Sequence, residues 1–333
     1  MHSPRTAWRR VIAAVMSAAL TPCSTPWAQG VTRGPATSPT LQARVRARLD
    51  SLHAASSIYA KQLATGREVE ARPDVPVNTV SVIKIPIMVL AYRDAEAGRL
   101  NLDERYTLRV EDLRAGTGVL KRFAPGLTLT YRDLIVQMMI TSDNSATDVM
   151  IERLGLNRVN QLLDSLGYHE TRLRTTIGQL FRGAWESWDP KYAKLTDGEI
   201  YQRGFPDSLR KAFAYAQDSS KWFGRTTARE TARLLEQLER GELASPASTN
   251  EMRGILQWQL YYSRLPQRIR FRVPIGHKTG DWPPIVANDV GILYAASGPI
   301  VIAVFTSANL GSFADLEATI GRVAEDILDA WGS

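Results

Sequence analysis

Apolar residues recur at helical spacing near the start and through the middle of the chain. Positions three or four residues apart predict a first helix over 41–52, and two β-rich runs joined by a Thr-Gly turn follow it, as in a hairpin, over 57–63 and 67–71. From about residue 81 to residue 260 the pattern is helical again. In this stretch we expect helices over 83–97, 131–140, 145–154, 159–166 and 228–238.

Strand patterns return in the last quarter of the chain. Three β-rich runs separated by Gly, Pro and Asn are followed by an amphipathic helix; the runs cover 272–278, 289–295 and 300–306, and the helix 316–331. Early and late strands can join one antiparallel sheet if the helical stretch is an excursion from it, because such a sheet needs helices to cover its apolar face. We therefore predict an α+β fold: an antiparallel sheet flanked by N- and C-terminal helices, plus an all-helical subdomain. A site is expected in the cleft between them.

The first 30 residues have the pattern of a secretory signal peptide. Three arginines and no acidic residue precede an apolar run over 11–20, and Ala28-Gln29-Gly30 is a small-x-small cleavage pattern. Residues 31–40 are rich in turn formers and predict a flexible lead-in. We expect a single domain over 41–333, its sheet subdomain at about 41–75 and 265–333 and its helical subdomain at about 76–264. The leader predicts export to the periplasm, without lipoprotein anchoring at Cys23, because a proline precedes that cysteine.

Composition removes several classes of function. With 44% hydrophobic and 23% charged residues in 333, the chain is of average globular composition. Its single cysteine and four scattered histidines argue against a disulfide framework and against a metal site. The net charge is +7, of which the leader contributes three arginines, and the remaining +4 includes no dense basic run, so we expect no nucleic-acid partner. No apolar run is long enough to span a bilayer.

Three short motifs carry the candidate chemistry. They are Ser81-Val82-Ile83-Lys84, Ser142-Asp143-Asn144 and Lys278-Thr279-Gly280, in this order along the chain. A Ser-x-x-Lys is weak evidence alone, and a second one stands at Ser208-Leu209-Arg210-Lys211. The three together, in matching structural contexts, are strong evidence for one site.

The first motif pairs a nucleophile with a base. The three-residue spacing places the hydroxyl of Ser81 and the amine of Lys84 on one face of the first turn of a helix. A serine there also meets backbone N–H groups, which stabilise an oxyanion. A lysine takes the serine proton if burial and a nearby cation lower its pKa, and Lys278 is a candidate for that cation.

The other two motifs add a proton relay and a binding strand. Ser142, in a turn between two helices, can pass a proton to a leaving nitrogen, while Asn144 offers its amide to the substrate or to Lys84. An edge strand ending in Lys278 and Thr279 can align a substrate amide and bind a carboxylate. Plainer interpretations exist: a helix cap at Ser81, a capping turn at Ser142 and a surface lysine at position 278.

From about residue 40 to the C-terminus the sequence resembles the class A serine β-lactamases and the related penicillin-binding proteins, whose three signatures these motifs are. Two further segments add to the resemblance: Thr226-Thr227-Ala228-Arg229 and Asn288-Asp289-Val290-Gly291. It implies that Ser81 is the acylated nucleophile, Lys84 its base and Ser142 a proton relay. The chemistry that the resemblance implies needs no metal and no organic cofactor.

The resemblance also assigns the binding residues. Lys278 and Thr279 would bind a substrate carboxylate, Gly280 completes their motif, and the backbone N–H groups of Ser81 and Asp281 would form the oxyanion hole. Asn144 would complete the substrate-binding set. The substrate implied is a β-lactam or a peptidoglycan-like molecule. We also expect the protein to be a monomer.

One departure from the family affects turnover. Class A enzymes hydrolyse the acyl-enzyme with a glutamate on an Ω loop soon after a Thr-Arg-Leu segment, and here the expected position falls near Ile177. The segment from there to Thr226 is longer than the family usually has. Glu186, between two tryptophans, is a candidate base if an extended loop brings it to the site; its plainer interpretation is a solvated loop carboxylate.

Three functions remain open on this evidence. The leading one is an exported serine hydrolase of the class A β-lactamase type, acylated at Ser81 and deacylated by water. The second keeps the acylation with another substrate, as in a D-alanyl-D-alanine peptidase, an esterase or an amidase. The third is a penicillin-binding sensor that acylates without turnover.

Overall fold

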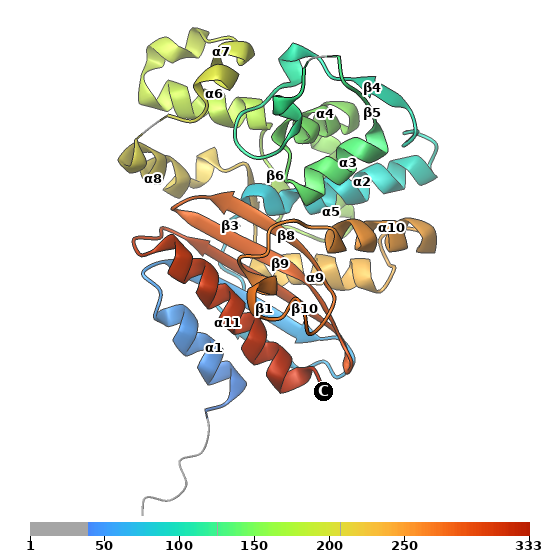
Figure 1. Ribbon diagram of the computed structural model, residues 1–333, viewed down its shortest axis with the longest axis vertical. Helices are drawn as coiled ribbons and strands as arrows, with labels where there is room; N and C mark the ends of the chain where they lie inside the picture. The colour runs from blue at the N-terminus through green and yellow to red at the C-terminus, as the bar shows by residue number, and fades with distance from the viewer. Residues whose placement is uncertain (1–38, 125, 207) are drawn as a thin grey trace, which may run out of the picture. The chain divides into compact units, whose positions relative to one another are not determined.

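Five antiparallel strands form the sheet at the centre of the fold (Figure 1). The computed structural model describes residues 39–333 except 125 and 207, so the predicted signal peptide and most of the lead-in lie outside the described residues. The strand order is β2-β1-β10-β9-β8, which leaves β8 at one edge. The strands are β1 (Ala55–Gln62), β2 (Glu68–Ala71), β8 (Ile275–Trp282), β9 (Val286–Ala295) and β10 (Gly298–Ser307).

Alternation along the strands divides the core between the two faces of the sheet. On β10, Ile300, Ile302 and Val304 pack with helices α1 (Leu41–Asp50) and α11 (Phe313–Trp331). Val301 and Phe305 point to the opposite face, which helix α9 (Ala228–Glu239) covers. Because side chains in a strand alternate between faces, this pattern fixes which strand positions meet the helical side of the molecule.

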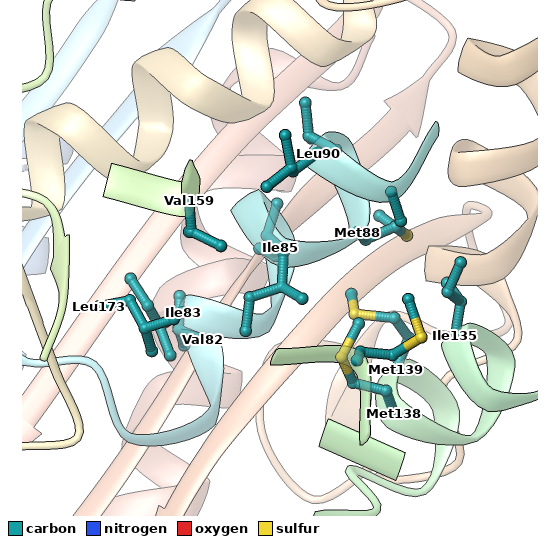
Figure 2. Close-up of a cluster of buried hydrophobic side chains, with 14 of the residues drawn as sticks. Val82, Ile83, Ile85, Met88, Leu90, Ile135, Met138, Met139, Val159 and Leu173 are labelled. Carbon is teal, nitrogen blue, oxygen red and sulfur yellow. The ribbon is translucent and has the colours of Figure 1, made fainter. Parts of the chain in front are cut away.

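The helical side is assembled around α2 (Lys84–Glu96), which is buried on almost all of its faces. Figure 2 shows its side chains among those of Ile135, Met138 and Met139 from helix α3. A helix that is apolar all round belongs in a core rather than on a surface. The other helices of this side are α3 (Tyr131–Ile140), α4 (Asn144–Leu154), α5 (Leu156–Ser165), α6 (Ile177–Trp188), α7 (Asp197–Arg203), α8 (Leu209–Gln217) and α10 (Pro246–Gln257).

Short elements connect the two sides. Single 3₁₀ turns include η1, which leads into α2, and η6, which precedes β8. The 3₁₀ turns are η1 (Val80–Ile83), η2 (Val110–Asp112), η3 (Leu120–Arg122), η4 (Pro190–Lys194), η5 (Ser219–Lys221) and η6 (Leu265–Arg268). Two small sheets pair β3 (Val77–Asn78) with β7 (Gly224–Thr226) and β6 (Arg172–Leu173), and β4 (Arg105–Thr107) with β5 (Thr128–Thr130).

The predicted α+β class, with its antiparallel sheet and flanking terminal helices, is confirmed. Three details differ. Ser81 lies inside the 3₁₀ turn η1, and the α-helix begins only at Lys84. Strand β8 begins later than expected and runs through the Lys-Thr-Gly motif. The segment 177–217, expected as a long loop, contains α6, α7 and α8. Within the described residues, no helix is long and apolar enough to cross a bilayer.

Candidate active site

Ser81 stands where the helical side meets the edge of the sheet. Its turn η1 contacts β8, β9 and α2, and its side chain is buried but faces a cavity. The preceding residue, Val80, has a φ of 44°, a left-handed conformation that a β-branched side chain strongly disfavours. Ser142 shares this feature with a φ of 55°. Such strain persists only where surrounding structure holds it, and it gathers at functional sites.

Lys84 is fully buried at the start of α2, three residues after Ser81. Its Nζ lies 2.8 Å from Ser142 O, 3.2 Å from Ser142 Oγ and 3.2 Å from Asn144 Oδ1. Burial, and after it the positive charge of Lys278, hold the pKa of Lys84 well below its ordinary value. The predicted base is therefore placed where a neutral amine is favoured.

Ser142 and Asn144 come from the loop between α3 and α4. The preceding loop fixes both, because Thr117 Oγ1 donates to Ser142 O at 2.8 Å and Asn144 Nδ2 donates to Ala115 O at 2.8 Å. Asp143, the middle residue of the motif, caps α4 through the N–H of Ala146. The motif thus combines one structural capping residue with two polar groups that face the amine of Lys84.

Lys278 reaches the same hydroxyl from the sheet. Its Nζ donates to Ser142 Oγ at 3.0 Å and to Thr279 O at 2.8 Å, and the side chain is fully buried. Burial lowers the pKa of Lys278 to about 8, although the charges of Asp281 and Asp289 act in the opposite direction. Two amines from different sides of the molecule therefore converge on Ser142 Oγ.

The glycine of the third motif is required by close packing. A Cβ on Gly280 would lie 2.6 Å from the carbonyl oxygen of Thr79 and 3.3 Å from the side chain of Asn288. Asn288 Nδ2 in turn donates to Asn78 O at 2.9 Å, which ties β9 to the chain entering η1. Position 280 therefore sets how closely the edge strand approaches the turn that carries Ser81.

Next along β8, Asp281 pairs with a buried guanidinium. Arg264 contacts Asp281, lies 3.0 Å from Glu317 Oε1, and donates to Asn288 O at 2.9 Å. Thr279 is also buried, and its Oγ1 has no hydrogen-bond partner among the described residues. The side chains of Thr279 and Asp281 alternate with that of Lys278 along the strand, so they leave the strand on the side opposite to the Lys278 side chain.

The site opens into a cavity of about 460 Å³. Ser81, Asn144 and Asp281 line it, as does a large apolar set. The rest of the lining is Val80, Gly116, Thr117, Ile177, Leu180, Phe181, Phe205, Phe223, Tyr261, Ser263, Arg264, Trp282, Pro283, Phe313 and Glu317. Among the described residues, no cluster of His, Cys, Asp or Glu could hold a metal ion.

Residues 40–331 match the model of a family described as the Beta-lactamase enzyme family. The chain belongs to this β-lactamase family. A β-lactamase of Streptomyces lavendulae is 25% identical over 281 residues, which are 81% of this chain and 79% of that protein. One of Streptomyces fradiae is 25% identical over 316 residues, 90% of this chain and 88% of that protein. The family and these relatives identify the chain as a serine hydrolase.

Two solved structures have the same fold. The β-lactamase from Sphaerobacter thermophilus DSM 20745 has a TM-score of 0.71 at 26% identity, covering 88% of this chain and 96% of that one. The protein PBP-A has a TM-score of 0.67 at 23% identity, covering 87% of this chain and 95% of that one.

Glu186, the candidate for the loop glutamate, lies outside the cavity lining. That side chain is exposed on the last turn of α6, is absent from the cavity lining, and makes no hydrogen bond or ion pair with a described residue. Buried positions of α6 are Ile177, Gly178, Leu180 and Ala184, so position 186 falls on the outer face of the helix. The structure thus does not bring Glu186 to Ser81, and Ile177 faces the cavity instead.

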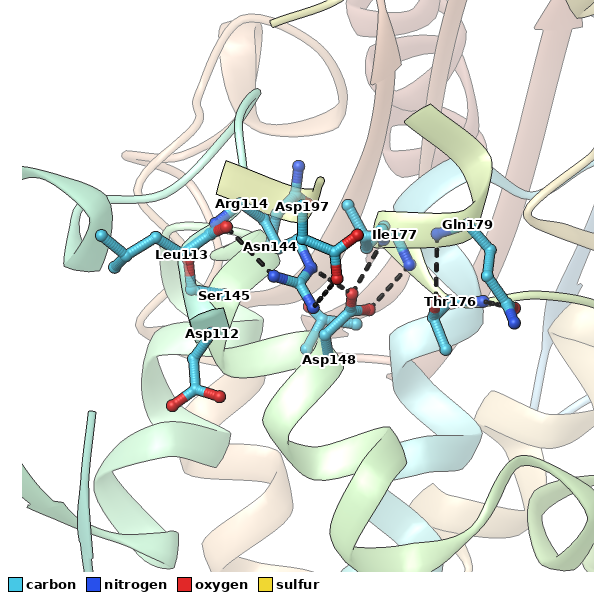
Figure 3. A network of polar contacts seen from close by, with 12 residues as sticks. Asp112, Leu113, Arg114, Asn144, Ser145, Asp148, Thr176, Ile177, Gln179 and Asp197 are labelled. Atoms are coloured by element: carbon cyan, nitrogen blue, oxygen red, sulfur yellow. Dashed lines mark hydrogen bonds and ion pairs between the residues drawn. The ribbon is translucent and has the colours of Figure 1, made fainter. Parts of the chain in front are cut away.

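A buried carboxylate that the sequence analysis did not single out holds α6 in place. Asp148 of α4 accepts from the N–H groups of Ile177 and Gly178 at 2.7 and 2.8 Å, and from Arg114 Nε at 2.6 Å (Figure 3). An acidic group at a helix N-terminus is favoured by the dipole and by the unpaired N–H groups there. Neither Asp148 nor Arg264 lies in one of the motifs, and spacing alone gives no signal for them.

The second Ser-x-x-Lys lies away from the cavity lining. Ser208 caps α8 by accepting from the backbone N–H of Lys211, whose side chain is exposed. Its Nζ donates to Trp188 O instead of to the serine. This copy is a helix cap, the plainer interpretation of the pattern.

Proposed function

We propose that this chain opens β-lactam rings by forming an acyl-enzyme at Ser81. The observation that carries the proposal is the convergence of two buried amines on Ser142 Oγ, one of them from Lys84, three residues after Ser81. Ser81 Oγ attacks the lactam carbonyl carbon as its proton passes to Lys84, and the ring C–N bond then breaks. The leaving nitrogen takes a proton from the Ser142 hydroxyl. Protonated Lys84 then returns a proton to Ser142, so the proton that left Ser81 ends on the leaving nitrogen.

Electrostatics support these roles. A lysine base must be neutral to accept a proton, and burial next to Lys278 favours the neutral form of Lys84. Lys278, with a pKa of about 8, keeps its charge at neutral pH, where it can attract a substrate carboxylate. We assign Thr279, Gly280, Asn144 and the N–H groups of Ser81 and Asp281 to substrate and oxyanion binding, as the resemblance implies.

Deacylation requires a group that holds and activates a water molecule next to the acyl-enzyme. The cavity-lining carboxylates, Asp281 and Glu317, are both bound by Arg264, and the buried Asp148 is saturated by its own partners. Among the described residues, none therefore offers a free carboxylate to hold a hydrolytic water at the cavity wall. This favours, as a second candidate, a penicillin-binding protein whose adduct at Ser81 is released slowly.

We further propose that the protein is exported to the periplasm and acts there as a monomer. The support for export is the arginine-containing, acid-free leader with its apolar run and small-x-small pattern.

A time course of intact-protein mass tests the proposal. The mature protein is mixed with benzylpenicillin and with a chromogenic cephalosporin, and adduct and hydrolysed product are followed together. We expect an adduct that Ser81→Ala abolishes and Ser208→Ala leaves intact. Fast product with little adduct establishes an efficient β-lactamase, whereas a lasting adduct supports the second candidate. Absence of any adduct and product would overturn both.

A further inference from the structure

One wall of the cavity is built largely by the segment 177–217, which is longer than the β-lactamase resemblance implies. Helix α6 supplies Ile177, Leu180 and Phe181, and the connection between α7 and α8 supplies Phe205. Trp282, at the end of β8, continues this surface from the sheet side. We call these five residues the aromatic wall, and the cavity joins them directly to Ser81.

Ring packing holds the wall together from three elements. The ring of Phe205 meets Trp282 edge-on at 4.8 Å and Phe181 edge-on at 5.5 Å between centroids. Tyr215 of α8 supports it from behind, 6.2 Å from Phe205, with its hydroxyl donating to Leu180 O at 3.1 Å. Edge-to-face packing of this kind stabilises a defined arrangement, so the wall is a preformed surface rather than loose side chains.

Charge on the cavity lining is already compensated. Asp281 and Glu317 share the guanidinium of Arg264, and the aromatic wall itself presents carbon. A peptide chain laid along it would leave backbone N–H and C=O groups without partners, and a charged side chain would lose its hydration without gaining a counter-ion. An uncharged ring, in contrast, exchanges water contact for contact with other rings.

We propose that the aromatic wall binds an uncharged aromatic side chain carried on the acyl half of the substrate. This inference rests on the proposed acylation at Ser81 and names the class of acyl group that reacts best there. A site adapted to peptide acyl donors would offer hydrogen-bonding groups to the peptide backbone. The aromatic wall instead offers the substrate's side chain only carbon atoms to contact.

The first test compares three penicillins that share a ring system and differ in the side chain. They are benzylpenicillin, its analogue with an extra carboxylate on the benzyl carbon, and 6-acetamidopenicillanic acid, which has only a methyl group. The measured quantity is the second-order rate constant of adduct formation at Ser81, by intact mass. We expect benzylpenicillin to react at least about tenfold faster than either of the other two. Equal rate constants for benzyl and acetyl side chains would overturn the inference.

The second test changes the wall. Phe205→Ala and Phe181→Ala are expected to lower the benzyl-to-acetyl ratio of rate constants about tenfold, because each removes ring contact that only the benzyl group uses. Leu209→Ala is the matched control: this exposed residue lies on the same segment, and its ratio should equal that of the unchanged protein. An unaltered ratio in both wall variants, each shown folded by its thermal midpoint, would contradict the proposal.

The two proposals fail in different ways. If Ser81 forms no adduct with any penicillin, the proposed function is wrong. If it forms adducts at rates that ignore the side chain, acylation stands and the wall is only a part of the core. Faster adduct formation from an N-acyl-D-alanyl-D-alanine peptide ester than from benzylpenicillin would also overturn the assignment of the wall.

Discussion

The charge of Lys278 is held in a fully buried site with a pKa of about 8, so it is lost just above neutral pH. The rate constant of acylation should rise with pH as Lys84 loses its proton, because its pKa is lowered and only the neutral amine accepts one. It should fall again above about pH 8, where Lys278 becomes neutral. Lys278→Arg should move that alkaline fall upward, since a guanidinium stays charged. Adduct formation measured across pH checks this, and an unmoved alkaline fall would contradict the role of Lys278.

Gly280 permits the edge strand to touch the turn that carries Ser81. A methyl group in Gly280→Ala would overlap the carbonyl oxygen of Thr79, a backbone atom that cannot rotate away. We expect acylation to fall at least about tenfold, since an error of about 1 Å in placement is enough for such a loss. Gly254→Ala is the control, because its Cβ would meet open space in helix α10. Equal acylation rates in the two variants would disprove the close-packing argument.

At the scale of elements, the first turn of α6 occupies the place where a hydrolytic carboxylate is expected. Ile177 faces the cavity at the N-terminus of that helix, a position whose dipole favours a negative charge. Ile177→Glu should therefore shorten the lifetime of the Ser81 adduct, by about a hundredfold if the new carboxylate acts as a general base. The decay of adduct mass after removal of free penicillin measures this. Glu186→Gln, on the outer face, should leave the decay unchanged.

Asp148 anchors the same helix. Asp148→Ala would leave two N–H groups of α6 and the guanidinium of Arg114 without their acceptor. Losing one partner of a buried ion pair costs about 3 kcal/mol, so the free energy of unfolding in urea should fall by about that amount. A loss below about 1 kcal/mol would show that water replaces the carboxylate without cost.

Sequence patterns predicted an element well where its end signals and its period agreed. Helix α3 begins at Tyr131 as predicted, because Thr130 and Asp133 form a capping box before an apolar period. Helix α6 begins with the same kind of box, formed by Thr176 and Gln179, but the resemblance implies a loop in this segment and so predicts no helix there. The helical period of this segment already places Glu186 on the face opposite to the apolar positions. The sequence therefore contained a signal that Glu186 points away from the cavity.

Across the whole molecule, the acylation machinery belongs to both sides of the fold. Ser81, Lys84 and Ser142 come from the helical side and Lys278 from the edge of the sheet. Each of the three motifs is a short contiguous run of residues, so the sequence alone is enough to find it. The contacts of Arg264, Asp148 and the aromatic wall join distant segments that only folding brings together. Long-range pairing of this kind has no local signature.

This distribution predicts how the protein loses function. If the two sides unfold together, the loss of acylation in urea should coincide with the loss of tryptophan fluorescence, with one midpoint for both. Acylation lost at clearly lower urea would show that the two sides separate before either unfolds.

Lys84 Nζ has three oxygen neighbours, and only one of them is able to donate a hydrogen. Ser142 O and Asn144 Oδ1 are carbonyl oxygens, whereas Ser142 Oγ belongs to a hydroxyl. A neutral amine has two N–H groups and one lone pair, so the two carbonyls can use both N–H groups and the lone pair is left for the proton of Ser81. Once the amine takes the proton of Ser81 it has three, and the hydroxyl becomes an acceptor whose hydrogen is free for the leaving nitrogen. Counting hydrogens therefore couples activation of the nucleophile to departure of the leaving group, without movement of the backbone.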